Sequence, residues 1–463
     1  MPGRVLVVAY NFPPVGGVGI MRTLKYVTYL PDSGWEPVVV TAKNPGVAIR
    51  DEDSERTLPA GLRVERAFSP EPAKVRHALG RVVKRMRQAG GDSTGEVGTA
   101  SGGAAPSELR PTSPWPGRLA TVWATATHLT FFPDEQVAWA PFAARAGLAV
   151  HRDTPVDVVY SSSAPISCHL AVGLIASKAD LPWVADFRDP WIGNAFAARP
   201  RGLHAFLQLR IERRIVALAD RVVFPTRGVA EGYAARYPEA ADRFVVIPNG
   251  YDRSDFPSLG ARPPAAHTDG RFHVAYGGSL YGDRELEILL DGIELLVSRR
   301  PGVRDLLAVD FIGWLNLRNQ AVARSYATPE RLGPMLSFAG FLPHREAMAR
   351  LSAADALLQL IGDGPNRGQI QGGKLMEYVG LDRPILAVVP EGDARALLRE
   401  LDWGICADPT PAGVAEGFER LLAAPLPTRR ADPEGRYDRV NLAMRLAAVL
   451  DEVADERTGP VGV

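Results

Sequence analysis

Cysteine is scarce in this chain. Its 463 residues include only two cysteines, Cys168 and Cys406, which lie in separate halves of the sequence. So few cysteines exclude a disulfide framework and a cysteine-rich zinc site, and they fit the reducing cytoplasm. No signal peptide is visible, because a strand-like segment follows Met1 almost at once, and no apolar run approaches the roughly 20 residues of a membrane span. We therefore predict a cytoplasmic protein.

The chain also has no net charge and lacks several motifs that mark particular chemistries. Its 53 basic residues balance 53 acidic residues, so a nucleic-acid or membrane partner would need a local patch, and we predict no nucleic-acid partner. The motifs GxGxxG, GxxxxGK(S/T) and HExxH do not occur, GxSxG does not occur between a predicted strand and a helix, and the two cysteines form no Cys-x-x-C pair. These absences argue against an NAD-binding site, P-loop phosphoryl transfer, a hydrolase and a zinc enzyme.

What the sequence does contain is a regular alternation of short apolar runs and helical patterns. The strands expected in a first block lie at 4–10, 37–42, 157–162, 183–187, 221–225 and 244–248, and those of a second block lie at 272–276, 308–312, 336–339, 356–360, 384–389 and 404–407. Continuous apolar strands between helices indicate parallel sheets that are covered on both faces. We predict an α/β fold of two Rossmann-like, doubly wound domains that face an interdomain cleft.

Composition suggests where these domains begin and end. A loop rich in proline and small polar residues separates the two blocks, which places an N-terminal domain at 1–253 and a C-terminal, nucleotide-binding domain at 271–425. The helical segment at 430–455 has no strand of its own. We predict that it crosses back to the N-terminal domain.

Two neighbouring segments of the first domain break the alternation. Residues 90–116 are rich in Gly, Ser, Thr, Pro and Ala and nearly lack large apolar groups, which predicts a flexible loop. Just before them, residues 74–87 place apolar side chains on one helical face and basic side chains around it. Such a helix can contact anionic lipid, which would make the protein peripheral at the inner membrane face, or it can dock on the protein by its apolar side. The sequence leaves both interpretations open.

The glycine-rich segment 368–389 carries the clearest sign of a binding site. Gly372 and Gly373 open a short helix that leads to a buried strand, so the backbone N–H groups at the helix start are uncovered. Unpaired donors and the positive end of the helix dipole suit a phosphate. Lys374 and Glu377 share one face of this helix, where the lysine can neutralise phosphate charge and the glutamate can accept hydrogen bonds from the vicinal hydroxyls of a ribose. The segment therefore predicts a site for a nucleoside diphosphate.

A glycine loop also follows the first predicted strand. Gly16 and Gly17 stand between that strand and a helix, where a ligand can approach the backbone closely. Such a loop can also be no more than a tight turn. The loop nevertheless follows the carboxyl end of the strand, where it is expected to face the cleft.

A further glycine loop begins the second domain. Gly278 and Ser279 follow the strand at 272–276, and Arg284 stands near the next helix start. An arginine fork matches a diphosphate well, so Arg284 is a candidate for the donor site. The alternative is a surface ion pair with Glu287 one helical turn on.

The segment DFRDPW ends another predicted strand with two carboxylates and an arginine. Asp186, Arg188 and Asp189 can bind sugar hydroxyls or position an acceptor, since loops at this sheet edge often carry function. They can equally form an internal ion pair that closes the turn before Pro190. His169 can line the cleft or pack inside its helix.

Taken together, six motifs in order along the chain resemble the family 4 glycosyltransferases, which are nucleotide-sugar enzymes of the GT-B fold. The motifs are FPPVGGVG, DFRDPW, VIPNGYD, YGGSLYGDR, FAGFLPHRE and GGKLMEYVGLDRPIL. The resemblance covers nearly the whole chain. It implies retaining transfer of a glycosyl group from a nucleoside diphosphate sugar to an acceptor hydroxyl of a glycan, a glycolipid or a natural product, with neither a metal nor another cofactor.

The resemblance also implies roles for the candidate residues. Arg284, Lys374 and the backbone N–H groups of Gly16–Gly17 and Gly372–Gly373 would meet the charge on the departing diphosphate. Gly278 and Ser279 would line the donor site, and Glu377 would bind the ribose. The residues expected at the nucleobase are Phe341 and Leu342; those expected on the acceptor side are Asp186, Arg188, Asp189 and His169.

Two positions depart from the family pattern. The family often shows two glutamates eight positions apart, and where the first would stand this chain has Gln369, a neutral amide beside the expected reaction centre. The basic pair after the third motif is reduced to Arg284, because Leu289 and Leu290 stand where a lysine is usual. We expect Lys374 to substitute for that lysine and Gln369 to influence the choice of donor sugar. A nucleotide-sugar epimerase and a catalytically silent nucleotide-sugar-binding subunit remain alternatives.

Overall fold

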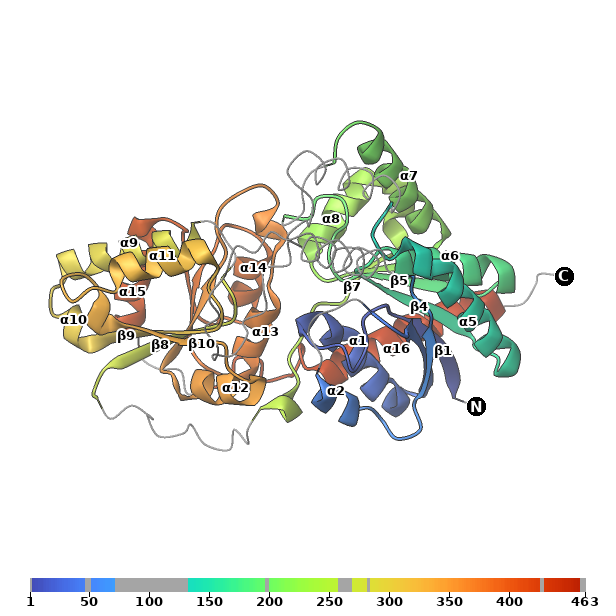
Figure 1. The fold of residues 1–463 in the computed structure, drawn as a ribbon, viewed down its shortest axis with the longest axis horizontal. Coiled ribbons are helices and arrows are strands. Elements are labelled where there is room, and N and C mark those ends of the chain that lie inside the picture. Colours follow the sequence, from blue (N-terminus) through green and yellow to red (C-terminus); the bar gives the residue numbers. More distant parts are fainter. Residues whose placement is uncertain are drawn as a thin grey trace, which may run out of the picture.

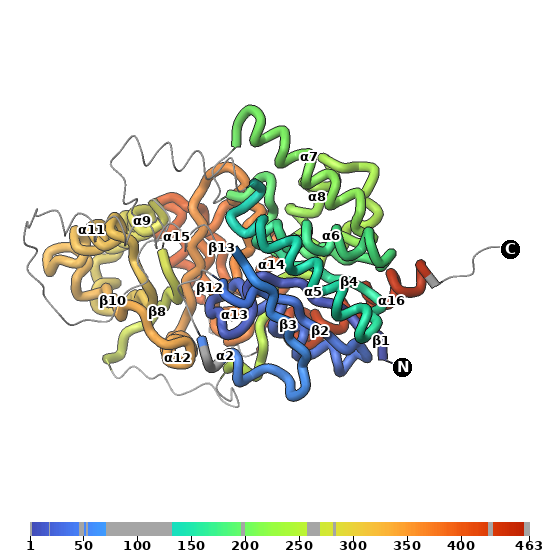
Figure 2. The backbone as a smooth tube through the Cα atoms, turned by 45° about the vertical axis from the view of Figure 1, so that its right-hand side comes forward, coloured from blue at the N-terminus to red at the C-terminus, as the bar shows by residue number. Residues whose placement is uncertain are grey.

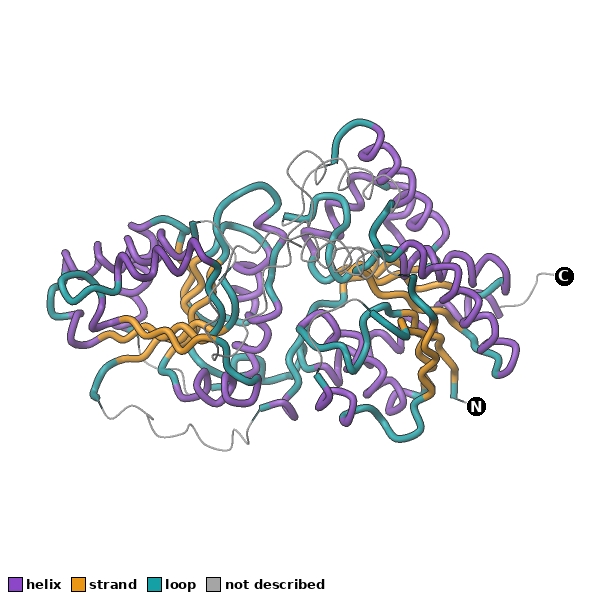
Figure 3. Tube along the Cα trace, in the orientation of Figure 1, coloured by secondary structure: helices purple, strands orange, loops and turns teal. Residues whose placement is uncertain are grey.

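The computed structural model of the chain describes residues 2–45, 51–70, 132–195, 200–256, 269–280, 284–424 and 429–458. Two separate parallel sheets, one in each half of the molecule, are covered by helices on both faces (Figure 1, Figure 3). The predicted basic helix at 74–87 and the predicted loop at 90–116 lie outside the described residues. No helix within those ranges combines the length and apolar character needed to cross a membrane.

The N-terminal sheet has seven strands within the described residues, in the order β3-β2-β1-β4-β5-β6-β7. Side chains along β1 alternate between two cores, because Leu6 and Val8 pack on one face while Val5 and Val7 pack on the other. Burial on both faces explains why this strand is apolar throughout. The strands are β1 (Gly3–Val8), β2 (Trp35–Ala42), β3 (Arg63–Ala67), β4 (Val158–Ser163), β5 (Trp183–Phe187), β6 (Arg221–Phe224) and β7 (Phe244–Val246). The helices of this half are α1 (Val18–Tyr29), α2 (Glu52–Arg56), α5 (Ala140–Asp153), α6 (Ser167–Ala179), α7 (Leu203–Leu218) and α8 (Arg227–Arg236).

The C-terminal sheet has six strands within the described residues, in the order β10-β9-β8-β11-β12-β13. The same alternation holds there, since Val274 and Tyr276 of β8 join one core and Ala275 joins the other. The strands are β8 (Phe272–Gly277), β9 (Leu307–Ile312), β10 (Leu336–Gly340), β11 (Ala356–Leu360), β12 (Ile385–Val388) and β13 (Ile405–Ala407). The helices are α9 (Glu285–Arg299), α10 (Val303–Leu306), α11 (Leu317–Tyr326), α12 (His344–Ala353), α13 (Gly373–Gly380), α14 (Asp393–Glu400) and α15 (Pro411–Ala423).

The predicted fold class is confirmed by these two parallel sheets. Each predicted strand overlaps an observed strand, with ends that differ by at most two residues. The exception is β3, which the sequence analysis does not predict. It lies at the sheet edge, and most of its side chains are only half-buried, so it lacks the continuous apolar run that marks the other strands.

Helix α16 (Arg439–Thr458) packs on the N-terminal sheet beside α1 (Figure 1, Figure 2). Its apolar side chains, Leu442, Leu446 and Leu450 among them, are at most 1% exposed and complete the core that contains Val5 and Val7. The last described segment of the chain is therefore part of the N-terminal core, although the C-terminal sheet precedes it in sequence.

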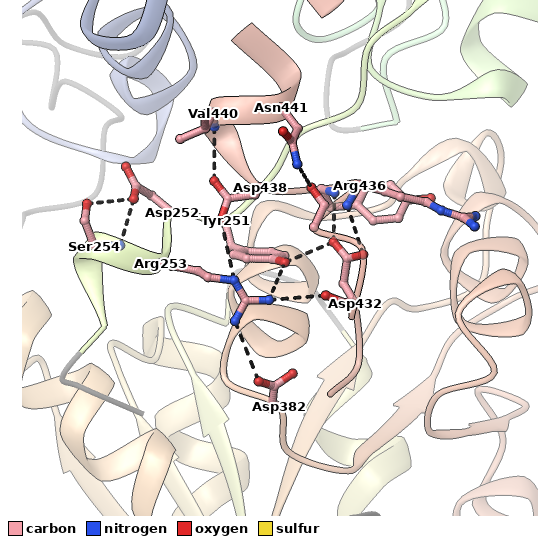
Figure 4. Close-up of polar contacts among 12 residues, drawn as sticks. Tyr251, Asp252, Arg253, Ser254, Asp382, Asp432, Arg436, Asp438, Val440 and Asn441 are labelled. Carbon is pink, nitrogen blue, oxygen red and sulfur yellow. Dashed lines mark hydrogen bonds and ion pairs between the residues drawn. The ribbon is translucent and has the colours of Figure 1, made fainter. Parts of the chain in front are cut away.

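An arginine joins the two places where the chain crosses between the halves (Figure 4). Arg253, in the first crossing, donates from Nη2 to Tyr251 Oη at 3.1 Å and to the Asp432 carbonyl of the second crossing at 3.2 Å. Its Nε lies 3.6 Å from an Asp438 carboxylate oxygen, and its Nη1 lies 4.0 Å from Asp382 of the C-terminal half. One guanidinium thus holds both crossings and the C-terminal half at a single point.

Candidate active site

Loops from the two halves meet at the carboxyl ends of both sheets. After β5, the Gly193 carbonyl accepts a hydrogen bond from Asn366 Nδ2 at 2.8 Å. After β6, Gly228 in the first turn of α8 donates its N–H to Asp393 Oδ1 at 3.0 Å, and its carbonyl accepts from Gln369 Nε2 at 3.3 Å. Asn366 and Gln369 follow β11, and Asp393 follows β12. Doubly wound folds bind ligands at this edge, so a ligand of this protein is expected between these loops.

Helix α13 begins with uncovered backbone at the predicted phosphate position. Gly372, its N-cap, has a φ of 78°, a left-handed conformation that favours glycine, and no side chain caps the helix start. The ammonium of Lys374 donates to Tyr276 Oη at 2.6 Å and to the Ser279 carbonyl at 3.3 Å. It also lies 4.4 Å from the centroid of the Tyr276 ring. A cation and free N–H donors therefore lie together at the start of this helix.

The glycine loop after β8 is held against α13. Gly277 donates its N–H to Tyr378 Oη at 2.8 Å, which ties the loop to the helix. Gly278 has a φ of 107°, and a Cβ added there would lie 2.3 Å from Lys374 Cε. Glycine at this position thus leaves the space that the Lys374 side chain fills. Gly373 is the first residue of the helix itself.

Burial shifts the pKa values of both charged groups on this helix. Burial lowers the pKa of Lys374 to about 8, and the nearby Glu377 opposes the shift. Burial raises the pKa of Glu377, while the charges of His344, Lys374 and Arg439 oppose that shift. No described residue donates a hydrogen bond to the Glu377 carboxylate. It is therefore an acceptor whose bonding capacity is unused within the described structure, one helical turn from Lys374.

Arg284 stands exposed as the N-cap residue of α9. Its guanidinium forms no ion pair with any described residue, and Glu287, the partner considered for it, lies 3.8 Å from Arg318 instead. Leu289 and Leu290 are 0% exposed in the core of the C-terminal half. A basic side chain at either position would be buried, so Arg284 is the candidate phosphate ligand at the start of α9.

The predicted nucleobase residues lie between β10 and α12. Phe341 is 71% exposed, an unusual state for so large an apolar side chain. Leu342 is half-buried and packs against the core cluster that contains Leu375 and Met376 of α13. Phe341 thus presents an exposed aromatic surface next in sequence to Leu342, which packs against residues of α13.

In the N-terminal half, the glycine loop and the DFRDPW loop lie against each other. Gly17 is the N-cap of α1 with a φ of 109°, and a Cβ added there would meet nothing within 4 Å. Arg188 donates from Nη1 to the Gly19 carbonyl at 2.6 Å and pairs with Asp189 at 2.8 Å. Asp189 is half exposed, at 52%. Gly17, Gly19, Arg188 and Asp189 therefore form one surface at the carboxyl end of the sheet, while Gly16 is buried beneath it.

Asp186 lies in the core instead of on that surface. Its side chain is 0% exposed and accepts hydrogen bonds from Arg22 Nε at 2.6 Å, from Arg22 Nη2 at 3.2 Å and from Tyr160 Oη. Arg22 is 1% exposed and also donates to the carbonyls of Ile247 and Pro248. A buried carboxylate requires such partners. The structure corrects the prediction that Asp186 acts at the reaction centre or contacts an acceptor, because its carboxylate pairs with Arg22 in the core. The ion pair within the DFRDPW segment joins Arg188 and Asp189 instead.

His169 is also buried and does not line a cleft. It is 0% exposed in α6, its Nδ1 is 2.8 Å from Ser161 Oγ, and its ring lies 4.5 Å from that of Phe187. Burial lowers the pKa of His169 to about 3, so the imidazole is neutral at physiological pH. The prediction of an acceptor-side role is corrected, and packing within the helix is the observed alternative.

Gln369 faces the N-terminal half. Its side-chain amide donates to the Gly228 carbonyl, and its own carbonyl accepts from Thr226 Oγ1 at 3.4 Å. Thr226 is the N-cap of α8. Gln369 thus links the two halves at the edge where the candidate residues gather, and its carboxamide supplies the donor that a glutamate at this position would lack.

The sequence comparison agrees with this geometry. Residues 102–255 match the family model described as Glycosyltransferase Family 4. This match covers about a third of the chain, which is similar to the family 4 glycosyltransferases over those residues. No curated protein sequence matches the chain.

Solved structures share the architecture of the glycosyltransferase at low sequence identity. They include the α,α-trehalose 6-phosphate synthase of Burkholderia multivorans, with 14% identity, a TM-score of 0.57 and coverage of 100% of this chain and 99% of that chain. The HepE protein of Anabaena in complex with UDP-glucose has 13% identity, a TM-score of 0.54 and coverage of 99% and 100%. The sucrose-phosphate synthase of Thermosynechococcus elongatus has 15% identity, a TM-score of 0.51 and coverage of 98% and 97%. At these identities the likeness shows the GT-B fold.

Sequence reasoning missed several residues of this glycosyltransferase that shape the site. Asp393 binds the first turn of α8 from the other half, and Asn366 reaches the Gly193 carbonyl. Neither follows a local signal, because each acts on a partner more than 150 residues away in sequence. Tyr276 had a signal, since an aromatic hydroxyl directly before two glycines lies at the end of a buried strand.

Proposed function

We propose that this glycosyltransferase moves a sugar from a nucleoside diphosphate sugar to an acceptor hydroxyl with retention of the anomeric configuration. The bond between the anomeric carbon and the diphosphate breaks, the acceptor oxygen bonds to the same face of that carbon, and the acceptor proton passes to a diphosphate oxygen. The enzyme needs no covalent nucleophile for this path. Its task is to hold the two substrates and to stabilise the charge that develops on the diphosphate.

The arrangement at the start of α13 carries the proposal. Lys374, held by Tyr276 at 2.6 Å, lies beside the uncapped N–H groups that follow Gly372. Three kinds of positive charge thus converge: an ammonium, backbone donors and the positive end of the helix dipole. Glu377 lies one turn further along with an unused carboxylate, at the spacing expected for the ribose of the same nucleotide. Phosphate and ribose would both be bound by one helix.

Further groups complete the donor site. Arg284 is exposed and without an ion pair among the described residues, so its guanidinium is available to the diphosphate. Phe341 and Leu342 would border the nucleobase, with Phe341 as the stacking surface. Gly278 and Ser279 would lie against the diphosphate beside Lys374. The proposal includes no metal ion, and we expect that a chelator leaves turnover unchanged.

The N-terminal half would supply the acceptor side. On the same half, the backbone N–H groups of Gly16–Gly17 at the start of α1 would contribute to binding the donor's diphosphate, and a Cβ added at position 17 would meet nothing within 4 Å. Arg188 and the half-exposed Asp189 stand beside this loop, and Asp189 can accept a hydrogen bond from an acceptor hydroxyl. Gln369 would contact the donor sugar or control how closely the two halves approach. These assignments belong to the proposal, as does the class of acceptor, which is a glycan, a glycolipid or a hydroxylated natural product.

The test is a panel of nucleotide sugars incubated with the enzyme, each with and without oligosaccharide, glycolipid and phenol acceptors. We expect nucleoside diphosphate release that depends on the acceptor, and a product with the donor's anomeric configuration by NMR. Lys374→Met should lower this turnover, whereas Leu317→Ser, an exposed change on α11, should not.

Each alternative has its own outcome. Conversion of the donor sugar without acceptor would replace the proposal with epimerisation. Binding of a nucleotide sugar with neither product across the panel would replace it with a silent binding subunit. Inversion of the anomeric configuration would keep the transferase and overturn the retaining mechanism.

A further inference from the structure

Helix α7 presents apolar and basic side chains together on its outward side. In its first two turns Leu203, Phe206 and Leu207 are 65%, 54% and 36% exposed. Three exposed arginines continue the same side at helical spacing over the next two turns. We call this surface the α7 outer face, and it consists of Leu203, Phe206, Leu207, Arg210, Arg213 and Arg214. Exposed apolar residues are ordinary singly, but three adjacent ones beside three cations form a patch.

The rotation of α7 is fixed from its inner side. Glu212 is 0% exposed and accepts hydrogen bonds from Tyr233 Oη at 2.8 Å, Tyr237 Oη at 2.9 Å and Arg236 Nη1 at 2.7 Å. Burying a carboxylate with this many partners anchors the helix to α8. The outer face is therefore set by the fold and does not arise from a helix that is free to turn.

The arginines of the outer face are available for a partner. None of the three forms an ion pair or a hydrogen bond with a described residue, and Arg210 only lies over the Phe206 ring, 5.7 Å from its centroid. Elsewhere in the described ranges many arginines pair with carboxylates, as Arg221 does with Glu456 and Arg331 does with Glu294. The α7 outer face is thus a local positive patch on a protein whose formal net charge is zero.

We propose that the α7 outer face docks the enzyme on an anionic lipid bilayer. The chemistry of both halves of the face suits this partner. Leucine and phenylalanine side chains can enter the boundary between headgroups and acyl chains, while guanidiniums contact the lipid phosphates. An acidic protein would pair with the arginines but would supply no defined contact for Leu203, Phe206 and Leu207. A nucleic acid would leave these apolar side chains exposed to water.

The position of α7 adds a consequence for the substrate. The helix lies at the outer edge of the N-terminal half in both views (Figure 1, Figure 2). Glu212, on its inner side, also accepts the N–H of Ile192 at 3.1 Å, and Ile192 follows directly on the DFRDPW segment that carries Arg188 and Asp189. A docked α7 would therefore hold the loop next to the proposed acceptor side near the lipid surface.

The test is co-sedimentation of the full-length protein with vesicles. One set contains phosphatidylcholine alone and the other contains equimolar phosphatidylcholine and phosphatidylglycerol. The variants are Arg210→Gln/Arg213→Gln/Arg214→Gln and Phe206→Ser/Leu207→Ser. The charge-matched control, Arg152→Gln/Arg300→Gln/Arg324→Gln, removes three exposed arginines from other surfaces. Affinity for a nucleoside diphosphate is measured on every variant to show that the fold is intact.

We expect the wild type to bind the anionic vesicles and to ignore the neutral ones. Each arginine at an anionic surface contributes a factor of about five, so the triple variant should bind roughly 100-fold more weakly while the control triple binds like the wild type. The Phe206→Ser/Leu207→Ser variant should keep binding at low salt and lose it at moderate salt. Equal losses in the α7 and control triples would overturn the proposal, as would a wild type that stays in the supernatant. Serine substitutions that dissolve a dimer without changing vesicle binding would assign the face to a second copy instead.

Discussion

Replacement of Gly278 by alanine tests whether Lys374 acts on the nucleotide. The added Cβ would lie 2.3 Å from Lys374 Cε, 2.6 Å from its Nζ and 3.2 Å from its Cδ. Because these atoms belong to a flexible side chain, the lysine can move away, and the fold should survive. The ammonium would then leave the Tyr276 hydroxyl and the Ser279 carbonyl, which now hold it at 2.6 Å and 3.3 Å.

The expected loss follows from the contact that moves. A hydrogen bond to a charged group contributes about 1.5–3 kcal/mol, so nucleoside diphosphate affinity should fall by about 10- to 150-fold. Alanine with a φ near 107° also costs on the order of 1–3 kcal/mol of stability. Gly34→Ala is the matched control, because Gly34 has a φ of 83° and a Cβ there would meet nothing within 4 Å. It should lose stability and keep its affinity.

The assay is isothermal calorimetry with whichever nucleoside diphosphate binds most tightly, combined with thermal unfolding. Lys374→Met should reproduce the loss of affinity. The double variant Gly278→Ala/Lys374→Met should bind the nucleotide about as weakly as either single variant, since both substitutions remove the same contact. Fully additive losses, or an unchanged affinity in Gly278→Ala, would refute the argument that the glycine makes room for a phosphate-binding lysine.

Three further outcomes are expected. Since the pKa of Lys374 is lowered to about 8 and a bound diphosphate favours its charged form, nucleotide affinity should fall as the pH rises through about 8; calorimetry should show no such alkaline fall in Lys374→Met. Glu377→Ala should weaken nucleotide binding by about 1–3 kcal/mol and remove any preference for the ribose over its 2′-deoxy form, whereas an unchanged affinity would exclude Glu377 from the site. Leu446→Ala, at a side chain 1% exposed in the N-terminal core, should lower the free energy of unfolding by about 2–5 kcal/mol in urea titrations, while Leu317→Ala, at a side chain 69% exposed, stays within about 0.5 kcal/mol.

The parts of the fold that could be predicted from sequence are those with a local signal. Strands buried on both faces are apolar along their whole length, so their positions and the two-domain class follow from the sequence. The edge strand β3, with Arg63, Glu65 and Arg66 among its residues, has no such signal. The start of α13 was also predictable, because Gly372, Lys374 and Glu377 are neighbours in sequence and their chemistry depends on helical spacing alone.

What could not be predicted depends on partners far away in sequence. From the sequence, Asp186 is expected to be a surface carboxylate. In the structure it lies in the core, where it is paired with Arg22, 164 residues earlier in the chain. Its neighbour Arg188 does reach the surface, so one motif of six residues holds both a structural and an exposed group. Gln369, which is predicted to influence the choice of donor sugar, also donates to the Gly228 carbonyl of the other half, a contact that its own segment does not indicate. Long-range pairing decides these roles, and no pattern within one segment encodes it.

The most direct test of the central claim is a structure of the enzyme with a bound nucleoside diphosphate. The β-phosphate should lie at the N-terminus of α13, within hydrogen-bond distance of Lys374 Nζ, with the ribose hydroxyls on Glu377 and the base beside Phe341. A nucleotide bound away from α13, or one whose ribose does not touch Glu377, would contradict the proposed donor site.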